Sequence, residues 1–257
     1  MKIVLFCIDD LAFVPELLEG VFAEYSNCIV KAYVSKSLFS YKKLRRKLSF
    51  FIKNGYPFCI KKSDLIRYAS WRLRLKLFGY QGHRSLLAYF HSKGVTAEYI
   101  NDINDPDKLL YLESLQADVF LFAPFDKVAK THFINIPKTG VFNVHLGKLP
   151  EYRGGLSAFW VLCKGDPSAG ASMHRVVEEI DAGSLITEVR LDVKTNNMKN
   201  LMTETVRVSS QMIVQGLKRI ENNPNFAIDV TGRANRYLLY PELKDFCAFY
   251  KRGCQLI

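Results

Sequence analysis

The 257-residue sequence lacks the features that mark membrane-spanning and secreted proteins. It contains no apolar run of about 18 residues, which excludes an ordinary membrane-spanning helix. The apolar start at Met1–Ile8 runs directly into Asp9 and Asp10, without a small-residue cleavage site. No secretory signal is therefore predicted, and a cytoplasmic location is expected.

Cysteine pairs and glycine-rich loops are also missing. The six cysteines form no C-x-x-C pair, which argues against a zinc knuckle, a redox motif or a disulfide framework, and no metal site is expected. The first predicted strand, Ile3–Ile8, is not followed by G-x-G-x-x-G, and G-x-x-x-x-G-K-[ST] is absent from the chain. Dinucleotide-dependent oxidoreductases and P-loop enzymes are thereby excluded.

Positive charge is concentrated in one segment. Lys42–Lys76 holds twelve Lys or Arg residues against the single acid Asp64, whereas the rest of the chain has twenty-four basic and twenty-four acidic residues. This segment carries the whole net charge of +11. A protein that coats nucleic acid over its whole surface is therefore excluded, because the basic character is local.

The apolar pattern predicts an α/β fold. Short apolar or β-branched runs alternate with stretches of helical periodicity, which is typical of a Rossmann-like, mostly parallel sheet with helices on both faces. The predicted strands are 3–8, 28–34, 96–100, 118–123, 140–145, 171–177 and 185–193, and helical patterns lie at 14–22 and 197–220. Residues 36–84 interrupt this rhythm and are interpreted as a basic insertion with one or two short helices.

The densest polar group lies on the predicted strand Gly140–His145. Alternation places Asn143 and His145 on one face of that strand, near the edge where open α/β sheets bind ligands. An imidazole can take a proton from an attacking amine, and an amide N–H can donate to the oxygen that becomes negative in acyl transfer. An acid would then be needed to set the charge of the imidazole. Taken without its surroundings, however, His145 is explained equally well as a half-buried structural histidine.

The surrounding sequence resembles the signature N-x-H-x-S-L-L-P-x-Y-R-G of folate-dependent formyltransferases, and residues 143–154 read N-V-H-L-G-K-L-P-E-Y-R-G. Residues 170–183, G-A-S-M-H-R-V-V-E-E-I-D-A-G, are similar to the G-x-[ST]-x-H-x-[MV] strand and the D-x-G loop of that family. Asn143 and Asp181 have the family spacing of 38 residues. The resemblance covers about 117–193 strongly, and the chain is most like the nucleotide-sugar (amino sugar) N-formyltransferases.

The resemblance implies a catalytic set of Asn143, His145 and Asp181. In this assignment Asn143 polarises the formyl carbonyl, His145 handles protons, and Asp181 orients His145 or relays a proton through water. Gly183 in the D-A-G turn is expected to adopt a backbone conformation that other residues avoid. His174 matches a family position within a predicted strand, and structural support is the favoured interpretation of it.

The resemblance also implies a formyl donor, 10-formyltetrahydrofolate, with its pterin against the backbone of one loop and beside another. The implied cofactor-binding residues are Phe125, Asp126, Lys127, Val128, Val177 and Ile180. Lys148, Tyr152 and Arg153 are candidates for substrate binding, with solvated loop charges as the alternative for the two cations. The chain departs from the signature at Gly147 and Lys148, where many members have Ser-Leu, so a serine hydroxyl contact to the substrate is missing at that position.

Within the family, the acceptor implied is a nucleotide-linked amino sugar, of the kind used in O-antigen or lipopolysaccharide synthesis. The expected domains are a formyltransferase catalytic domain over 1–195, with the insertion at about 36–84, and a C-terminal helix with a small appendage over 196–257. A glycinamide ribonucleotide or methionyl-tRNA type formyltransferase is the alternative, although the tail is too short for the β-barrel of the second type. A formyltetrahydrofolate hydrolase that uses water as acceptor is a further rival.

The basic insertion allows an interpretation from another class, a membrane- or nucleic-acid-binding module. We expect instead that the protein has no nucleic-acid partner and no stable membrane insertion. The insertion then attracts an anionic substrate, covers the sheet as a solvated basic face, or forms the contact of a homodimer.

Overall fold

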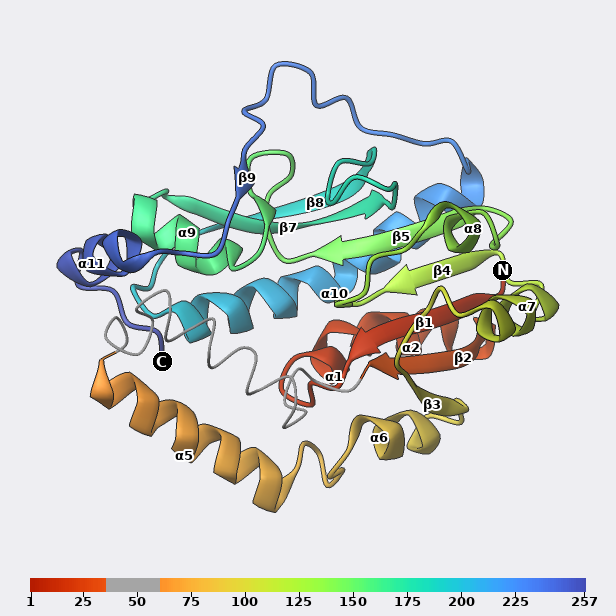
Figure 1. Cartoon of the computed structure of the whole chain (residues 1–257), viewed down its shortest axis with the longest axis horizontal. Coiled ribbons are helices and arrows are strands. Elements are labelled where there is room, and N and C mark those ends of the chain that lie inside the picture. The colour runs from red at the N-terminus through yellow and green to blue at the C-terminus, as the bar shows by residue number, and fades with distance from the viewer. Residues whose placement is uncertain (36–60) are drawn as a thin grey trace.

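The computed structural model describes residues 1–35 and 61–257, which contain a seven-stranded sheet with helices on both faces (Figure 1). The strands are β1 (Ile3–Ile8), β2 (Ile29–Ser35), β3 (Ala97–Ile100), β4 (Val119–Phe122), β5 (Gly140–His145), β7 (Ser168–Arg175) and β8 (Leu185–Asp192), with β6 (Arg153–Gly154) and β9 (Tyr237–Leu238) in a separate two-stranded pair. The helices are α1 (Val14–Leu17), α2 (Glu19–Tyr25), the 3-10 turn η1 (Ser26–Cys28), α5 (Lys62–Phe78), α6 (Leu86–Ser92), α7 (Pro106–Ser114), α8 (Thr131–Ile134), α9 (Ser157–Lys164), α10 (Met198–Asn222) and α11 (Leu243–Lys251).

The strand order of the sheet is β3-β2-β1-β4-β5-β7-β8. The pairs among β3, β2, β1, β4 and β5 are parallel, whereas β7 is antiparallel to both β5 and β8. The predicted Rossmann-like, mostly parallel sheet is therefore confirmed. The chain order reverses between β1 and β4, and in open α/β sheets ligands bind beyond the carboxyl ends of the strands at such a point.

Alternation along β1 explains why both faces of the sheet are covered. Ile3, Leu5 and Cys7 point into one apolar core together with α1, α2, α6 and α10, while Val4 and Phe6 point into a second core with α7 and α8. Each of these five side chains is 0% exposed. A strand that is apolar on both faces requires helices on both sides, because burial of apolar surface is the main stabilising contribution.

Two predicted elements differ from the structure. The sequence pattern suggested a strand at 171–177, but β7 already begins at Ser168, because Ser168 to Ala171 pair with the far end of β8. This pairing overrides the low strand propensity of Ser168, Ala169 and Gly170. In the insertion, residues 36–60 lie outside the described part of the chain, and 62–78 form one helix of 17 residues where short helices were expected.

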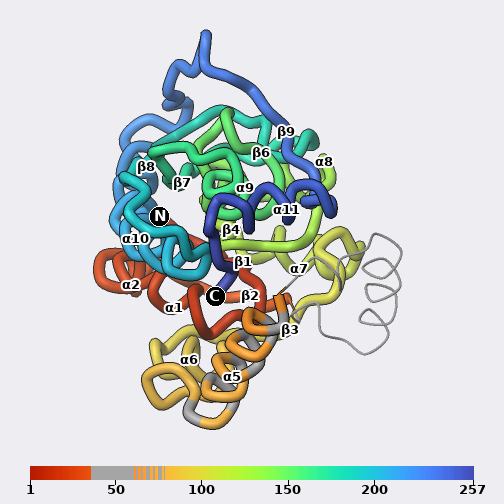
Figure 2. Tube along the Cα trace, turned by 90° about the vertical axis from the view of Figure 1, so that its left-hand side faces the viewer, coloured from red at the N-terminus to blue at the C-terminus, as the bar shows by residue number. Residues whose placement is uncertain are grey.

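The C-terminal segment, residues 223–257, contacts the rest of the molecule at several places. Strand β9 pairs with β6, and the ring of Phe249 on α11 stacks on that of Phe159 on α9 with centroids 4.7 Å apart. Figures 1 and 2 both show α11 beside α9. Asp64, the single acid of the basic segment, is 3% exposed and accepts a hydrogen bond from the Tyr250 hydroxyl at 3.0 Å. This contact anchors the start of α5 to the C-terminal segment.

Helix α10 packs against the sheet within the first core, so the predicted boundary at 195/196 does not separate it from that core. The division into domains itself stays a prediction. None of the helices in the described residues has the length and apolar character needed to cross a membrane.

Gly216 provides a test of this packing. A Cβ at Gly216 would lie 2.4 Å from Met173 Sδ and 2.9 Å from Thr187 Cγ2, so α10 can approach the sheet only because this position has no side chain. We expect Gly216→Val to lower the free energy of unfolding by about 1–3 kcal/mol through overpacking. The melting temperature should fall by roughly 2–4 °C for each kcal/mol, measured by circular dichroism. Gln215→Val, at an exposed position of the same helix, is the control and should change it little.

Candidate active site

The polar cluster predicted from the sequence forms at the carboxyl end of β5. Asn143 on β5 is the register partner of His174 on β7, so the two side chains are neighbours across the strands. Asn143 Nδ2 lies 3.0 Å from His174 Nε2 and donates to Asp181 Oδ1 at 3.5 Å. The antiparallel pairing of β5 with β7 therefore brings together residues that are 31 positions apart in the sequence.

Asp181 follows β7 in a short loop and has a backbone φ of +51°, which is uncommon for a residue other than glycine. Its carboxylate accepts the Gly154 N–H at 2.9 Å, and its two oxygens face His145 Nδ1 at 3.6 Å and His174 Nε2 at 3.4 Å. A side chain held in this way by several chain segments can sustain an unfavourable backbone conformation, and such conformations cluster at functional sites.

The expectation for Gly183 was wrong in its reason. The positive φ in the D-A-G turn belongs to Asp181, whereas Gly183 has none. A Cβ at Gly183 would lie 1.8 Å from the carbonyl oxygen of Arg175. Glycine is therefore required here for the close approach of two backbone segments, which brings the Asp181 loop back onto the end of β7.

His145 is held at both ring nitrogens. Nε2 lies 2.7 Å from the Tyr152 carbonyl oxygen and carries the proton of that hydrogen bond, while Nδ1 faces Asp181 Oδ2. Burial lowers the pKa of His145, although the negative charge of Asp181 and the Tyr152 carbonyl oppose this shift. The ring is therefore biased towards its neutral form, as is needed in a group that accepts a proton.

The pKa of Asp181 shifts in the opposite sense to burial. Burial raises it, but the hydrogen bond from His174, the charge of His145 and the Gly154 N–H outweigh this effect and lower the pKa to about 2. The carboxylate is thus ionised at neutral pH and can stabilise a positive charge on a neighbouring imidazole.

His174 belongs to the polar cluster, because its ring faces both Asn143 and Asp181. It is 2% exposed, and its Nδ1 donates to the Arg175 carbonyl oxygen at 2.9 Å. Its Nε2 can accept from the Asn143 amide when unprotonated, or donate to Asp181 when protonated. Within the Asn143 amide, an unprotonated Nε2 can therefore pair only with the nitrogen, whereas a protonated Nε2 can pair only with the oxygen.

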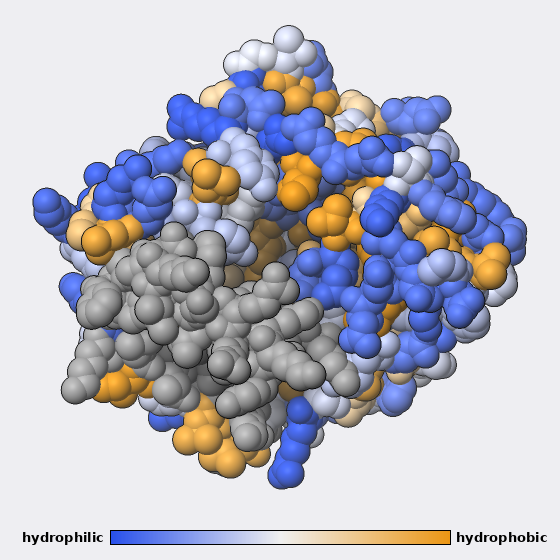
Figure 3. Space-filling model, viewed as in Figure 1, coloured by the Kyte–Doolittle hydropathy of each residue, from blue (hydrophilic) through white to orange (hydrophobic). Residues whose placement is uncertain are grey.

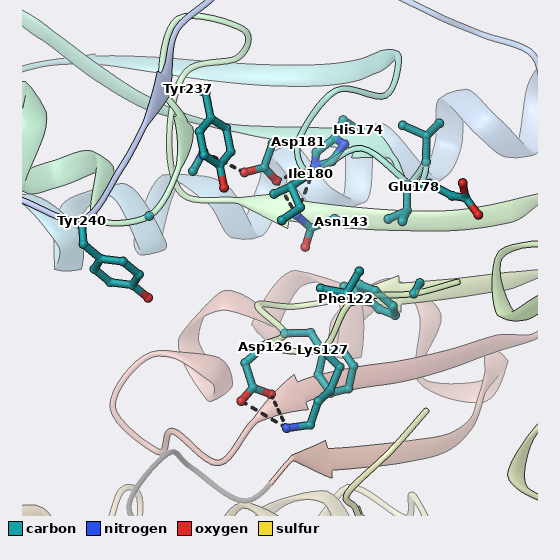
Figure 4. A pocket seen from close by; sticks show the side chains of 17 residues that line it. Phe122, Asp126, Lys127, Asn143, His174, Glu178, Ile180, Asp181, Tyr237 and Tyr240 are labelled. Atoms are coloured by element: carbon teal, nitrogen blue, oxygen red, sulfur yellow. Dashed lines mark hydrogen bonds and ion pairs between the residues drawn. The ribbon is translucent and has the colours of Figure 1, made fainter. Parts of the chain in front are cut away.

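Two cavities meet at this cluster. The first, of about 410 Å³, is lined by His174 and the second, of about 420 Å³, by His145. Figure 4 shows the first cavity between the Asn143–Asp181 group and the loop that carries Asp126 and Lys127. In Figure 3 apolar side chains lie inside and above a hollow near the centre of the face that is seen. Both cavities are lined by Phe125, Asn143, Gly154, Gly155, Ile180 and Asp181.

All six predicted cofactor-binding residues line the first cavity. They come from the loop after β4 and the loop before Asp181, and they are Phe125, Asp126, Lys127, Val128, Val177 and Ile180. The sequence analysis missed Tyr237 and Tyr240, which line the same cavity and are 50% and 62% exposed. The pairing of β9 with β6 brings Tyr237 to the site, and Tyr240 follows three residues later, so no local signal marked them.

Lys148, Tyr152 and Arg153, the candidate substrate-binding residues, line neither of these two cavities. Lys148 is 5% exposed, and its Nζ contacts Asp166 Oδ2 at 3.0 Å and Ser168 Oγ at 2.7 Å. The Tyr152 hydroxyl donates to the same carboxylate at 2.9 Å. The cation at position 148 is thus neutralised inside the protein.

Arg153 has a structural contact within the site. Its guanidinium pairs with Glu179 and donates to the Ile180 carbonyl oxygen at 2.7 Å from Nη2. It therefore holds the loop that positions Asp181, and it lines a third cavity of about 380 Å³ together with Glu179 and Asp181.

Across residues 1–35 and 61–257, no three His, Cys, Asp or Glu side chains are arranged to hold a metal ion.

Comparison with known proteins identifies the family. The model of the formyl transferase family matches residues 83–217, which include Asn143, His145, His174 and Asp181. The chain belongs to the formyl transferase family.

Its methionyl-tRNA formyltransferase relative from Prochlorococcus marinus (strain MIT 9215) is 29% identical over 143 residues, which cover 52% of this chain and 44% of that protein. The match thus spans less than half of the length of this curated relative.

Solved structures of the same fold include an N-formyltransferase from Helicobacter canadensis in complex with folinic acid and dTDP-3-aminofucose. It has a TM-score of 0.56 and 15% identity over 93% of this chain and 70% of that chain. A phosphoribosylglycinamide formyltransferase from Anaplasma phagocytophilum has a TM-score of 0.59 and 16% identity over 95% and 98%. Both likenesses concern the formyltransferase fold.

The lowered pKa of Asp181 predicts a pH dependence of stability. The folded-state value of about 2 lies below the ordinary 3.8, so the ionised carboxylate stabilises the fold above pH 3.8, and this contribution disappears as the pH falls towards 2. The shift corresponds to roughly 2 kcal/mol.

We expect Asp181→Asn to lose less stability than the wild type between pH 5 and pH 2.5, measured by urea unfolding at each pH. Asp107→Asn, at an exposed position on α7, should follow the wild-type dependence. If Asp181→Asn also followed it, the carboxylate would not be held in the ionised state.

Proposed function

We propose that the protein transfers a formyl group from 10-formyltetrahydrofolate to the primary amine of a nucleotide-linked amino sugar. The observation that carries this proposal is the pair of cavities that meet at Asn143 and Asp181. A transfer between two substrates requires two binding spaces that share the reacting groups, because the donor carbon and the acceptor nitrogen must approach to about 3 Å.

The first cavity fits the donor. It has the size of an ordinary small-molecule site, and it combines apolar walls from Phe122, Phe125 and Ile180 with polar groups at Asp126 and Glu178. Folate has a planar ring with polar edges and an apolar middle, and this lining suits both parts. When bound, the donor supplies an activated formyl carbonyl. The backbone of residues 125–128 and the side chains of Val177 and Ile180 would hold it.

The second cavity fits the amine-bearing end of the acceptor. Among the described residues that line it, Asp10 and Asp181 are acids and none is Lys or Arg. A cavity with this lining favours an amine over a phosphate, so in this proposal the phosphates of the nucleotide remain outside it. The basic segment Lys42–Lys76 within the insertion would attract these phosphates, since long-range electrostatic attraction requires no contact with the reacting groups.

The three residues of the catalytic set would then act in turn. Asp181 stabilises a positive charge on His145, so that the imidazole can take the proton that the amine loses. The Asn143 amide serves the oxygen that becomes negative. In the structure its Nδ2 faces His174 and Asp181 (Figure 4). Donation into the cavity therefore requires the amide to turn over, and a protonated His174 could then donate to its oxygen.

The direct test is formyl transfer followed by mass spectrometry. The donor is 10-formyltetrahydrofolate, and the acceptors are a panel of nucleotide-linked amino sugars, glycinamide ribonucleotide and methionyl-tRNA. We expect a mass gain of one formyl group on an amino sugar nucleotide. Asn143→Ala, His145→Ala and Asp181→Ala should each reduce turnover by roughly a hundredfold or more.

The matched control for these variants is His132→Ala, which removes an exposed histidine on α8 and should leave turnover unchanged. Formylation of glycinamide ribonucleotide or of methionyl-tRNA in preference to every sugar would assign the alternative acceptor. Release of formate without an acceptor would indicate a hydrolase.

The lowered pKa of His145 predicts the pH profile of this reaction. The neutral imidazole accepts the proton, so kcat/KM should fall in acid as His145 becomes protonated. Because burial lowers the pKa from its ordinary value of 6.5, the midpoint of this acidic limb should lie below pH 6.5. Initial rates between pH 4.5 and 8.5 measure it, and a midpoint above 6.5 would contradict the assignment of His145 as the base.

A further inference from the structure

Gly147 is one of the two positions at which this chain departs from the family signature, which has serine there. A Cβ at Gly147 would lie 2.4 Å from Ser157 Oγ, 2.8 Å from Ser157 Cβ and 2.7 Å from His145 Nε2. All three distances are shorter than the non-bonded contacts that a Cβ atom makes, so no side chain fits at this position. The volume that a side chain at position 147 would need is therefore filled by Ser157, which belongs to a different segment.

Ser157 is the first residue of α9 and is 7% exposed. Its Oγ lies 3.3 Å from His145 Nε2. It also lines the second cavity, where it is the only hydroxyl-bearing side chain among the described lining residues. Gly147 and Ser157 thus form a complementary pair: the hydroxyl is absent at one position and present at the other, beside the same imidazole.

Packing on both sides fixes the position of Ser157. Leu156, immediately before it, has a φ of +60° and directs the chain into α9. The helix is then fixed from behind, because Phe159 packs against Phe246 and Phe249 of α11. These contacts hold the start of α9 against the His145 ring and leave the hydroxyl little freedom to move away.

The chemistry of a hydroxyl suits this position. His145 Nε2–H donates to the Tyr152 carbonyl oxygen, and Ser157 Oγ can accept a share of the same proton. Its own O–H then remains available on the cavity side. Should Nε2 lose its proton, the same hydroxyl can rotate and donate to the bare nitrogen, so the ring keeps a partner in both states.

We propose that Ser157 is a positioning residue for His145 and supplies, from α9, the hydroxyl that the signature places at position 147. This inference rests on the proposed formyl transfer, because it concerns the group that takes the proton from the amine. Gly147 is then required because a side chain there would displace both Ser157 and His145.

The first test compares Ser157→Ala with Ser114→Ala, which removes an exposed hydroxyl on α7. Loss of one hydrogen bond to the imidazole should reduce kcat by about three- to tenfold, with a smaller effect on KM, and Ser114→Ala should match the wild type. A purely structural serine would lower the melting temperature and leave kcat of the folded enzyme unchanged, and that result would overturn the proposal.

The second test moves the hydroxyl between the two positions. Gly147→Ser alone should be worse than Ser157→Ala, because its Cβ displaces both neighbours. The variants G147S/S157G and G147A/S157G remove the contact with the Ser157 side chain, place the same Cβ at position 147 close to His145 Nε2, and differ by one hydroxyl, so they are compared with each other. We expect kcat of G147S/S157G to exceed that of G147A/S157G severalfold, and equal values in two folded proteins would contradict the proposed role.

A third measurement does not depend on turnover. The side-chain ¹⁵N resonances of His145, recorded in wild type, Ser157→Ala and Ser114→Ala, report the hydrogen bonding of its Nε2. They should shift only in Ser157→Ala. If the wild type formylated none of the acceptors but this shift occurred, the proposed function would fail while the contact of Ser157 with His145 held. If the wild type was active and neither the resonances nor kcat changed in Ser157→Ala, the inference about Ser157 would fail alone.

Discussion

The arrangement of the site depends on the contacts that the carboxylate of Asp181 makes. It accepts the backbone N–H of Gly154, faces two imidazoles and accepts from the Asn143 amide. These partners lie on β5, β6 and β7, and this one side chain contacts all three. The backbone of Asp181 takes a positive φ to reach them. An unfavourable conformation is maintained because several contacts determine it together.

The two histidines that face this carboxylate line different cavities. His145 lines one cavity and has its Nε2 proton held by a backbone carbonyl, whereas His174 lines the other and contacts the amide of Asn143. The two rings share an acid but face different spaces. A reaction that moves a group from one space to the other can therefore use a separate ring on each side.

The C-terminal segment contributes to the site through packing. Strand β9 brings Tyr237 and Tyr240 to the first cavity, and α11 supports α9, which carries Ser157 beside the second. The same segment contacts α5 through Asp64. Changes in this part of the chain should thus reach both cavities, although none of the predicted catalytic residues lies in it.

The sequence by itself determined the type of fold and the members of the polar cluster. A buried strand has an unmistakable apolar period, and Asn143, His145 and Asp181 stand at a fixed spacing within a specific signature. The six residues predicted for the donor all line one cavity. The loop after β4 lies at the carboxyl edge of the parallel strands, as the sequence led us to expect. Strand β7 is antiparallel to β5, however, so the loop that follows it reaches this cavity only because it turns back towards Gly154.

Only the tertiary structure decided where Lys148, His174, Ser157 and the two tyrosines of the C-terminal segment lie. Lys148 is paired with Asp166 in the interior, whereas the sequence predicted a cation that binds substrate or a solvated loop charge. Ser157 fills the space left by Gly147 because the start of α9 lies beside His145 at the end of β5, a contact that no local pattern encodes. Local periodicity fixes which residues share a strand face, whereas contacts between distant segments depend on how helices and strands pack, and that is a property of the whole chain.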